Sequence, residues 1–345
     1  MKATPNNPPN NRLGSGISEV KIGTAVSKSG YPLQTRVANF LRQYFDVQEE
    51  WSYIDDDTKE LRAIDLLAEA RLFDTRRVGE LRVRPTLDLV IECKKSELPY
   101  LFFLSPGKPW VPYFPLLAGL FKREISITTD DDPSSWTFHI PHALGLHSHK
   151  FVSQGPKCCM SFTRCVRKGS NIVLSGSDPF HSLVMPIFKA MHHFQLIESP
   201  PTTAMYFDLH LTTGIGLLEA PMVGIRVSKD SHELVLVPWV RVIRHEPDKI
   251  PDWLSRTRLF AIDIIHKDFF QQYLNKYLLP FSREFSKLAI KHQQVLASGK
   301  AFARNMGKDS FNDIEQRLEP RKMITGAYRA KAALKNIFQV ATRRK

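Results

Sequence analysis

Cysteine is scarce in this chain, and its cysteines do not stand at paired spacings. The 345 residues hold four of them, Cys93, Cys158, Cys159 and Cys165. A disulfide-stapled secreted fold is therefore not indicated, and a reducing cytoplasm is the expected compartment. Because the cluster of three lacks the second ligand pair of a zinc finger, these cysteines are interpreted as packing residues.

The chain also lacks an apolar run that could cross a membrane as a helix. The segment that comes nearest, 98–121, contains five prolines and Lys108. Proline cannot propagate a helix, and lipid demands one, so this segment is predicted to be buried and irregular, with no membrane partner. Residues 1–30 are rich in Asn, Pro, Gly and Ser without an apolar signal region, and we expect a flexible lead-in.

Several motifs that would fix other functions are missing. The sequence has no phosphate-binding glycine loop, no nucleophile elbow and no internal repeat. It also has no helicase or methyltransferase signature. Nucleotide-driven enzymes, serine hydrolases and repeat solenoids are therefore not indicated.

Acidic residues are in deficit. The chain has 35 Asp and Glu against 48 Lys and Arg, a net charge of +13. Such an excess favours polyanion partners, nucleic acid first, although many soluble proteins are basic. The C-terminal stretch 299–345, basic and helical in pattern, carries twelve of the cations against four acids. It would grip a nucleic-acid backbone or form a solvated face, and both readings stay open.

The chain does contain a segment predicted to be a buried strand with charged residues at its end. The short apolar run Leu87–Ile91 follows a proline, which suits a strand better than a helix. It continues into Glu92, Cys93 and Lys94, and side chains alternate across a strand, so Glu92 and Lys94 share a face. The pair is either an ion pair at a strand terminus or a metal-binding carboxylate beside a functional lysine.

A second strand carries a matching acid. The run 61–68 is apolar apart from Asp65. In an antiparallel hairpin with its turn near Val78-Gly79, Asp65 falls opposite Glu92, with Cβ atoms about 5 Å apart. Two carboxylates that close repel unless a cation lies between them, and oxygen ligands suit Mg²⁺ or Mn²⁺. Asp88, opposite Glu69 in the same register, is at best an outer candidate.

Asp65 followed by Glu92-Cys93-Lys94 resembles the PD-(D/E)xK nuclease superfamily, whose fold is restriction-endonuclease-like. The order over 32–95 is similar: a helix at 32–45, a strand at 47–54, the strand with Asp65, then the strand with Glu92. One departure is Ile64, which stands where the family often has proline. The resemblance implies an α/β fold with a mixed central sheet flanked by helices.

The resemblance also implies a mechanism. One or two divalent ions, Mg²⁺ or Mn²⁺, would bind Asp65, Glu92 and the backbone carbonyl of Cys93. Lys94 would orient the attacking water or offset charge on the phosphoryl oxygens, and Gln34 would hold a water nearby. The substrate would be nucleic acid, most readily DNA, cut in a defence or repair setting. The expected contacts to its backbone are Lys95, Lys150, Lys157, Arg164, Arg167 and Lys168.

The rest of the chain is expected to complete this core. After the nuclease core begins at 31–97, residues 98–177 are predicted to be a β-rich insertion. Residues 178–255 would supply the remaining helix and strands, and 256–345 a helical, basic region. The expected elements are a helix at 178–196, strands at 204–211, 216–227 and 233–244, and a helix at 268–292 broken at Pro280.

Two other functions stay open. The chain could have the nuclease fold without activity and serve as a nucleic-acid-binding or assembly subunit. Alternatively, it belongs to another α/β class, and Asp65, Glu92 and Lys94 form a structural ion cluster. The sequence does not distinguish DNA from RNA or single from double strands. Cutting both strands of a duplex often requires two active sites, so a homodimer is one expectation.

Overall fold

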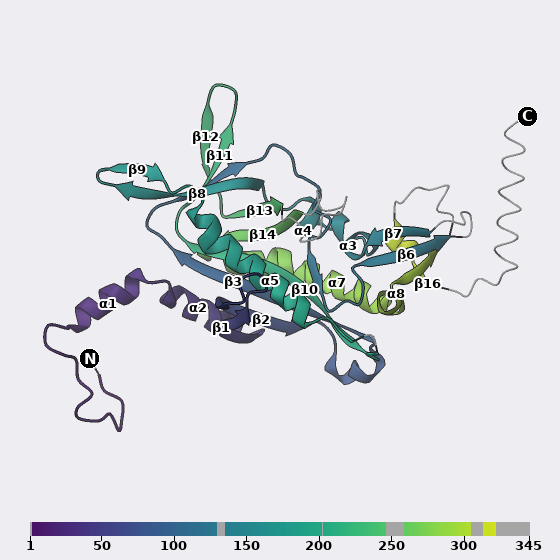
Figure 1. Cartoon of the computed structure of the whole chain (residues 1–345), viewed down its shortest axis with the longest axis horizontal. Coiled ribbons are helices and arrows are strands. Elements are labelled where there is room, and N and C mark those ends of the chain that lie inside the picture. Colours follow the sequence, from purple (N-terminus) through teal and green to yellow (C-terminus); the bar gives the residue numbers. More distant parts are fainter. Residues whose placement is uncertain (1, 130–134, 202, 246–258, 305–312, 322–345) are drawn as a thin grey trace, which may run out of the picture.

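The computed structural model describes residues 2–129, 135–201, 203–245, 259–304 and 313–321, and its centre is a twelve-stranded mixed sheet (Figure 1). In order across the sheet, the strands are β1 (Asp46–Ile54), β2 (Leu61–Arg71), β3 (Val83–Lys95), β10 (Phe207–Glu219), β14 (Leu259–His266), β13 (Trp239–His245), β8 (Cys158–Lys168), β4 (Tyr100–Leu104), β11 (Met222–Val227) and β12 (His232–Leu236), with β5 (Leu116–Ala118) beside β10 and β9 (Asn171–Leu174) beside β8.

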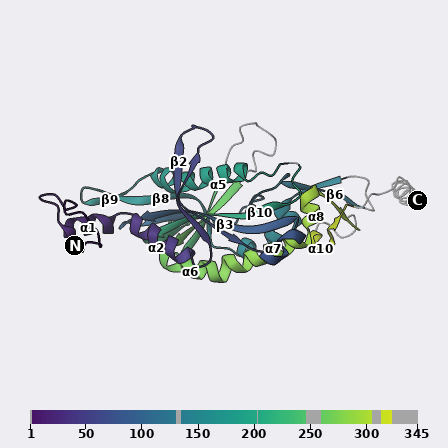
Figure 2. The ribbon, with the colours of Figure 1, turned by 90° about the horizontal axis from the view of Figure 1, so that it is seen from below.

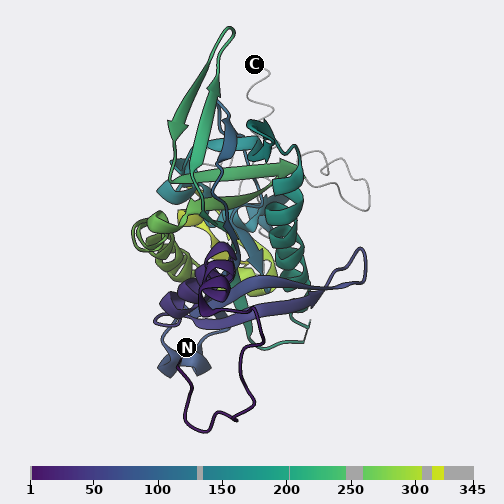
Figure 3. The same ribbon diagram turned by 90° about the vertical axis from the view of Figure 1, so that its left-hand side faces the viewer.

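Helices cover both faces of this sheet. Helix α5 (Met185–Ile197) lies on one face, while α2 (Tyr31–Leu41), α6 (Phe270–Tyr273) and α7 (Leu279–Lys291) lie on the other (Figures 2 and 3). The expectation of a mixed α/β sheet flanked by helices is confirmed. The remaining helices are α1 (Glu19–Lys28), α3 (Ile140–Ala143), α4 (Lys150–Ser153), α8 (Gln293–Ser298) and α10 (Ile314–Arg317).

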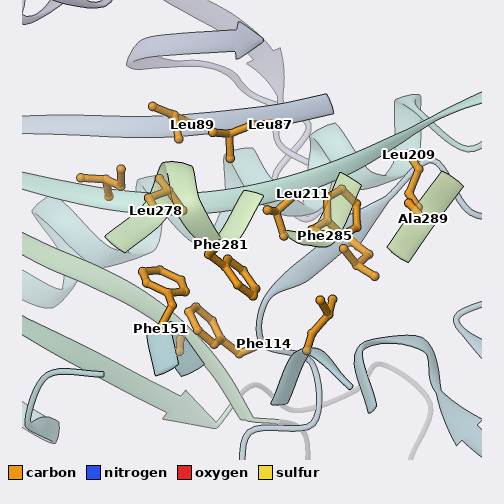
Figure 4. Close-up of a cluster of buried hydrophobic side chains, with 14 of the residues drawn as sticks. Leu87, Leu89, Phe114, Phe151, Leu209, Leu211, Leu278, Phe281, Phe285 and Ala289 are labelled. Carbon is orange, nitrogen blue, oxygen red and sulfur yellow. The ribbon is translucent and has the colours of Figure 1, made fainter. Parts of the chain in front are cut away.

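The two sheet faces bury two hydrophobic cores. Alternation along β3 directs Leu87 and Leu89 toward α7, whose Phe281 and Phe285 are fully buried (Figure 4). Val90 points the other way, into the core beneath α5. Burial of each such side chain stabilises the fold by about 1.5–3 kcal/mol. Because a shift by one residue would expose these side chains, their burial fixes the register of β3 against its neighbours.

The first three strands form an antiparallel meander, and the register predicted for the second hairpin is confirmed. Leu66 pairs with Ile91, so the next positions are Asp65 and Glu92. A short 3₁₀ turn, Thr75–Glu80, joins the strands near the predicted turn. The chain returns through α5 to β10, which runs parallel to β3.

Two glycines explain why β10 is longer than predicted. Gly214 and Gly216 lie in the middle of β10, in the region of the gap predicted between two strands. A methyl group on Gly214 would lie 2.5 Å from Met191 Sδ of α5, and one on Gly216 would lie 3.0 Å from Leu183. The glycines do not break the strand; they let a helix rest on its bare backbone.

Two prolines leave helical runs unbroken for one shared reason. Pro186 and Pro280 are the second residues of α5 and α7. Each helix follows directly on a five-residue π-helical segment, Phe180–Val184 and Leu274–Leu278 respectively. The wider turn removes the need for an amide donor at proline, so the break predicted at Pro280 is wrong.

Other expectations need correction. The stretch 98–121, predicted to be irregular, contains β4 and β5. The strand predicted over 233–244 is divided at Pro238. A second, four-stranded sheet consists of β16 (Glu319–Pro320), β15 (Lys300–Ala303), β6 (Glu124–Thr129) and β7 (Ser135–His139).

The ends of the chain also differ from expectation. Helix α1 was not predicted, and none of its residues is buried. The region 256–345, predicted to be helical, contributes β14 to the centre of the main sheet. Most of the basic stretch lies outside the described residues, at 305–312 and 322–345. Among the helices that the structure describes, none combines the length and apolar character needed to cross a bilayer. All four cysteines are buried, as expected for packing residues.

Candidate active site

The site is built where the β2–β3 ladder ends. Beyond the Leu66–Ile91 pair, the backbone N–H of Cys93 donates a hydrogen bond of 2.7 Å to Asp65 Oδ2. This bond holds the Asp65 carboxylate against the backbone of the strand that carries Glu92. The two predicted acids are therefore brought together by the hairpin itself.

Glu92 and Lys94 lie on one face of β3, as predicted. The Glu92 side chain is 8% exposed and forms an ion pair with Lys94, which is 31% exposed. Burial alone would lower the pKa of Lys94, but the Glu92 and Asp65 carboxylates raise it above its ordinary value. Lys94 is thus a firmly charged ammonium beside two carboxylates.

Both carboxylates resist ionisation. Burial, followed by the charge of Asp65, raises the pKa of Glu92 from 4.5 to about 7. Burial also raises the pKa of Asp65. A divalent cation would remove this repulsion, and the available donors are oxygens, which suit Mg²⁺ or Mn²⁺. The residues present therefore fit the expected metal.

Gln34 reaches the site from α2, as the resemblance implies. It is buried, and its Nε2 donates to Glu50 Oε1 at 2.7 Å and to the backbone carbonyl of Asp65 at 3.2 Å. Gln34 therefore positions two acids through one amide. The backbone of Gly30, just before α2, lies near the carbonyl of Cys93, so this end of the helix adjoins the expected metal ligand.

Glu50 is a site residue that the sequence analysis missed. The β1–β2 ladder pairs Glu49 with Leu66 and Trp51 with Ile64, which leaves Glu50 and Asp65 facing each other. Glu50 has a φ of 52°, a conformation that is strained for a glutamate within a strand. Its charge contributes to the raised pKa of Asp65. The register between the first two strands was the signal that could have revealed it.

The six cations predicted to contact a nucleic-acid backbone do not form one patch. Lys95 pairs with Glu219, at 3.3 Å, and donates to the carbonyl of Ser27. Lys157 precedes β8, whereas Arg167 lies near its other end, about 33 Å away at the rise of a strand.

The remaining three cations divide in the same way. Lys168, exposed, ends β8 beside Arg167. Arg164 pairs with Asp178 at 2.8 Å and lies opposite Tyr100 at the start of β4, while Lys150 begins the separate helix α4. Arg164, Arg167 and Lys168 thus lie along one end of β8, away from Lys150 and Lys157.

Comparison with protein-family models, with curated proteins and with solved structures found no match. No relative therefore supplies a function for this chain. The chemistry has to be inferred from the side chains themselves.

Proposed function

We propose that this protein is a metal-dependent nuclease of the PD-(D/E)xK type that hydrolyses phosphodiester bonds, with DNA as the foremost substrate. The observation that carries the proposal is the convergence of two carboxylates with raised pKa values, the half-buried Asp65 and the buried Glu92, beside Lys94. The order of elements adds support. Helix α2, the meander β1–β2–β3, helix α5 and the parallel strand β10 occur in the order expected for that fold, with strands β4 to β9 and helices α3 and α4 between β3 and α5.

The proposed ligands are the carboxylates of Asp65 and Glu92 and the backbone carbonyl of Cys93. A divalent ion held there would supply a water of lowered pKa and polarise the scissile phosphate. The Cys93 N–H keeps Asp65 aimed at this point, and Gln34 keeps Glu50 beside it. These contacts orient the ligands before substrate arrives.

Lys94 has the second role. In the absence of metal, its ammonium neutralises Glu92. With a divalent ion bound by the Glu92 carboxylate, the ammonium of Lys94 would be free to donate to the attacking water or to a phosphoryl oxygen. A fixed positive charge aimed at developing negative charge is a large contribution to catalysis of this kind.

Lys94→Ala is expected to lower the rate of plasmid nicking at least about 10²-fold, because it removes that fixed charge. Wild type should nick in Mg²⁺ or Mn²⁺ and not in EDTA. The matched control is Lys267→Ala, since Lys267 is 33% exposed and also pairs with a carboxylate, Asp268, at 2.6 Å. Cutting that persists in folded Lys94→Ala contradicts the site. A gel shift without cutting by wild type points to a binding subunit instead.

Glu50→Gln is expected to weaken Mg²⁺ binding about tenfold, because Glu50 adds negative charge beside Asp65 without being a proposed direct ligand. The measurement is the Mg²⁺ concentration that gives half of the full thermal stabilisation. Glu49→Gln is the control, since Glu49 precedes it in the strand and pairs with Arg42 instead. Equal midpoints for both variants would remove Glu50 from the site.

A further inference from the structure

A second acidic pair lies further along the same hairpin. Glu69 pairs directly with Asp88, four residues from Asp65 and Glu92 on their respective strands. The period of two directs Asp88 to the same face as Glu92, about 13 Å away along the strand. The nuclease mechanism uses neither residue.

The neighbouring strand adds a histidine to this pair. His210 of β10 lies beside Thr86 of β3 in the parallel register, and its Nδ1 is 3.0 Å from Asp88 Oδ2. Thr86 Oγ1 lies 2.9 Å from the same nitrogen. One ligand atom from each of Glu69, Asp88 and His210 can be chosen so that all three lie within 4.8 Å of one another. Atoms bound to a common ion are spaced about 3–4 Å apart, so little movement would close this set around a cation.

An unpartnered oxygen points to a missing ligand. Asp88 is fully buried, and its Oδ2 is held by Thr86 and His210. Its Oδ1 has no hydrogen-bond partner of ordinary geometry within the described part of the chain, and burial, followed by the charge of Asp88, raises the pKa of the neighbouring Glu69 carboxyl to about 7. Buried carboxylate oxygens are nearly always satisfied, because leaving one without a partner costs free energy. A cation at the centre of the cluster would satisfy it.

The far side of the imidazole faces a carboxylate, at ion-pair distance rather than in a hydrogen bond of good geometry. His210 Nε2 lies 3.3 Å from Glu198 Oε2, at the C-terminal end of α5. Metal-binding histidines usually donate their second ring N–H to a carboxylate, which orients the ring and strengthens it as a ligand. Phe194 packs against the edge of the same ring and restricts its rotation.

We propose that Glu69, Asp88 and His210 Nδ1 form a second metal site, separate from the nuclease centre, that binds a divalent transition-metal ion of the Zn²⁺ or Mn²⁺ class. An imidazole nitrogen with two carboxylates suits such ions, whereas Mg²⁺ prefers oxygen ligands and water. The ion would join β2, β3 and β10 to one another, and through Glu198 to α5. Its role is structural, because the fully buried Asp88 leaves no room for a substrate on that side.

The test uses the full chain carrying Glu92→Gln, so that the nuclease centre does not obscure the result. Titration with CoCl₂ should give visible absorption bands from one bound Co²⁺ per chain, and Zn²⁺ should displace it stoichiometrically. A 100-fold excess of Mg²⁺ should not. His210→Gln should abolish the bands, and Glu69→Gln should weaken Co²⁺ binding at least about tenfold.

Two features keep this test decisive. Glu69 is only half-buried, so Glu69→Gln should fold even if His210→Gln does not. Glu80→Gln is the matched control, since Glu80 lies in the same hairpin and pairs with the exposed Arg77. Absence of Co²⁺ binding to the folded protein, or binding that survives Glu69→Gln unchanged, overturns the proposal. Neither outcome bears on the nuclease, which is tested separately through Lys94.

Discussion

Glu92→Gln is expected to abolish phosphodiester cleavage and, at the same time, to stabilise the metal-free protein at pH 8. The loss of cleavage follows from the loss of a metal ligand, and we expect at least about a 10³-fold fall in rate. The gain in stability follows from the environment of the carboxylate, which is buried and lies beside Asp65. An amide of the same shape carries no charge to desolvate.

The raised pKa of Glu92 determines how the stability of the metal-free protein changes with pH. The pKa of Glu92 is about 7 in the folded protein against 4.5 ordinarily, so the folded state holds the proton more tightly. The stability that this proton provides is complete below about pH 4.5 and is lost as the pH rises through 7. Above pH 7 the ionised carboxylate costs about 1–3 kcal/mol, and the glutamine variant avoids that cost.

Chemical denaturation in EDTA at pH 5 and at pH 8 measures the effect. Wild type and Glu92→Gln should be close in stability at pH 5 and should diverge at pH 8, with the variant more stable. Adding Mg²⁺ at pH 8 should raise the stability of wild type far more than that of the variant, because binding to the native state alone stabilises it. A variant that is less stable than wild type at pH 8 would show that the Lys94 ion pair outweighs burial.

Asp263→Ala is expected to destabilise the protein by about 3–5 kcal/mol. Arg241 and Asp263 pair across β13 and β14 with both side chains buried, at 2.8 Å and 3.0 Å. Tyr273 donates a further hydrogen bond of 2.9 Å to the Asp263 carboxylate. Removing the carboxylate leaves a buried guanidinium without its counter-charge, in contact with the rings of Phe114 and Phe151.

Urea unfolding at neutral pH measures this loss. The matched control is Glu233→Ala, which breaks the exposed pair with Arg226 and should cost no more than about 1 kcal/mol. The double variant Arg241→Met with Asp263→Ala should recover part of the stability, because apolar side chains can replace a buried ion pair. An Asp263→Ala loss that equals the control would mean that water reaches Arg241.

Local rules were enough to predict the centre of the candidate site. The alternation of Asp65 and Glu92 with apolar residues fixes which face each acid takes, and the hairpin is short enough for its turn to set the register. Gln34 on the first helix was implied instead by the resemblance to the nuclease superfamily. Each of these inferences depends on residues close together in the sequence.

Non-local pairing accounts for most of what was missed. His210 meets Asp88 only because β10 returns beside β3 after more than a hundred residues, and no sequence period records that contact. Glu50 depends on the register of β1 and on a positive φ that is unusual for glutamate. Pro280, where a break was predicted, lies just after a π segment, and the gap predicted between two strands contains Gly214, on which α5 packs closely.

The contact between α5 and the bare backbone of Gly214 matters beyond local packing. Near its start, α5 is anchored to β1 by Tyr53, which donates to the carbonyl of Pro186, and to the residue just after β1 by the ion pair of Lys189 with Asp55. Just past its far end, about 20 Å away, Glu198 meets His210. The contact at Gly214, near the middle of α5, therefore sets the distance between the whole helix and the sheet. A larger residue at Gly214 would push α5 away from the sheet and would disturb the contacts at both of its ends together.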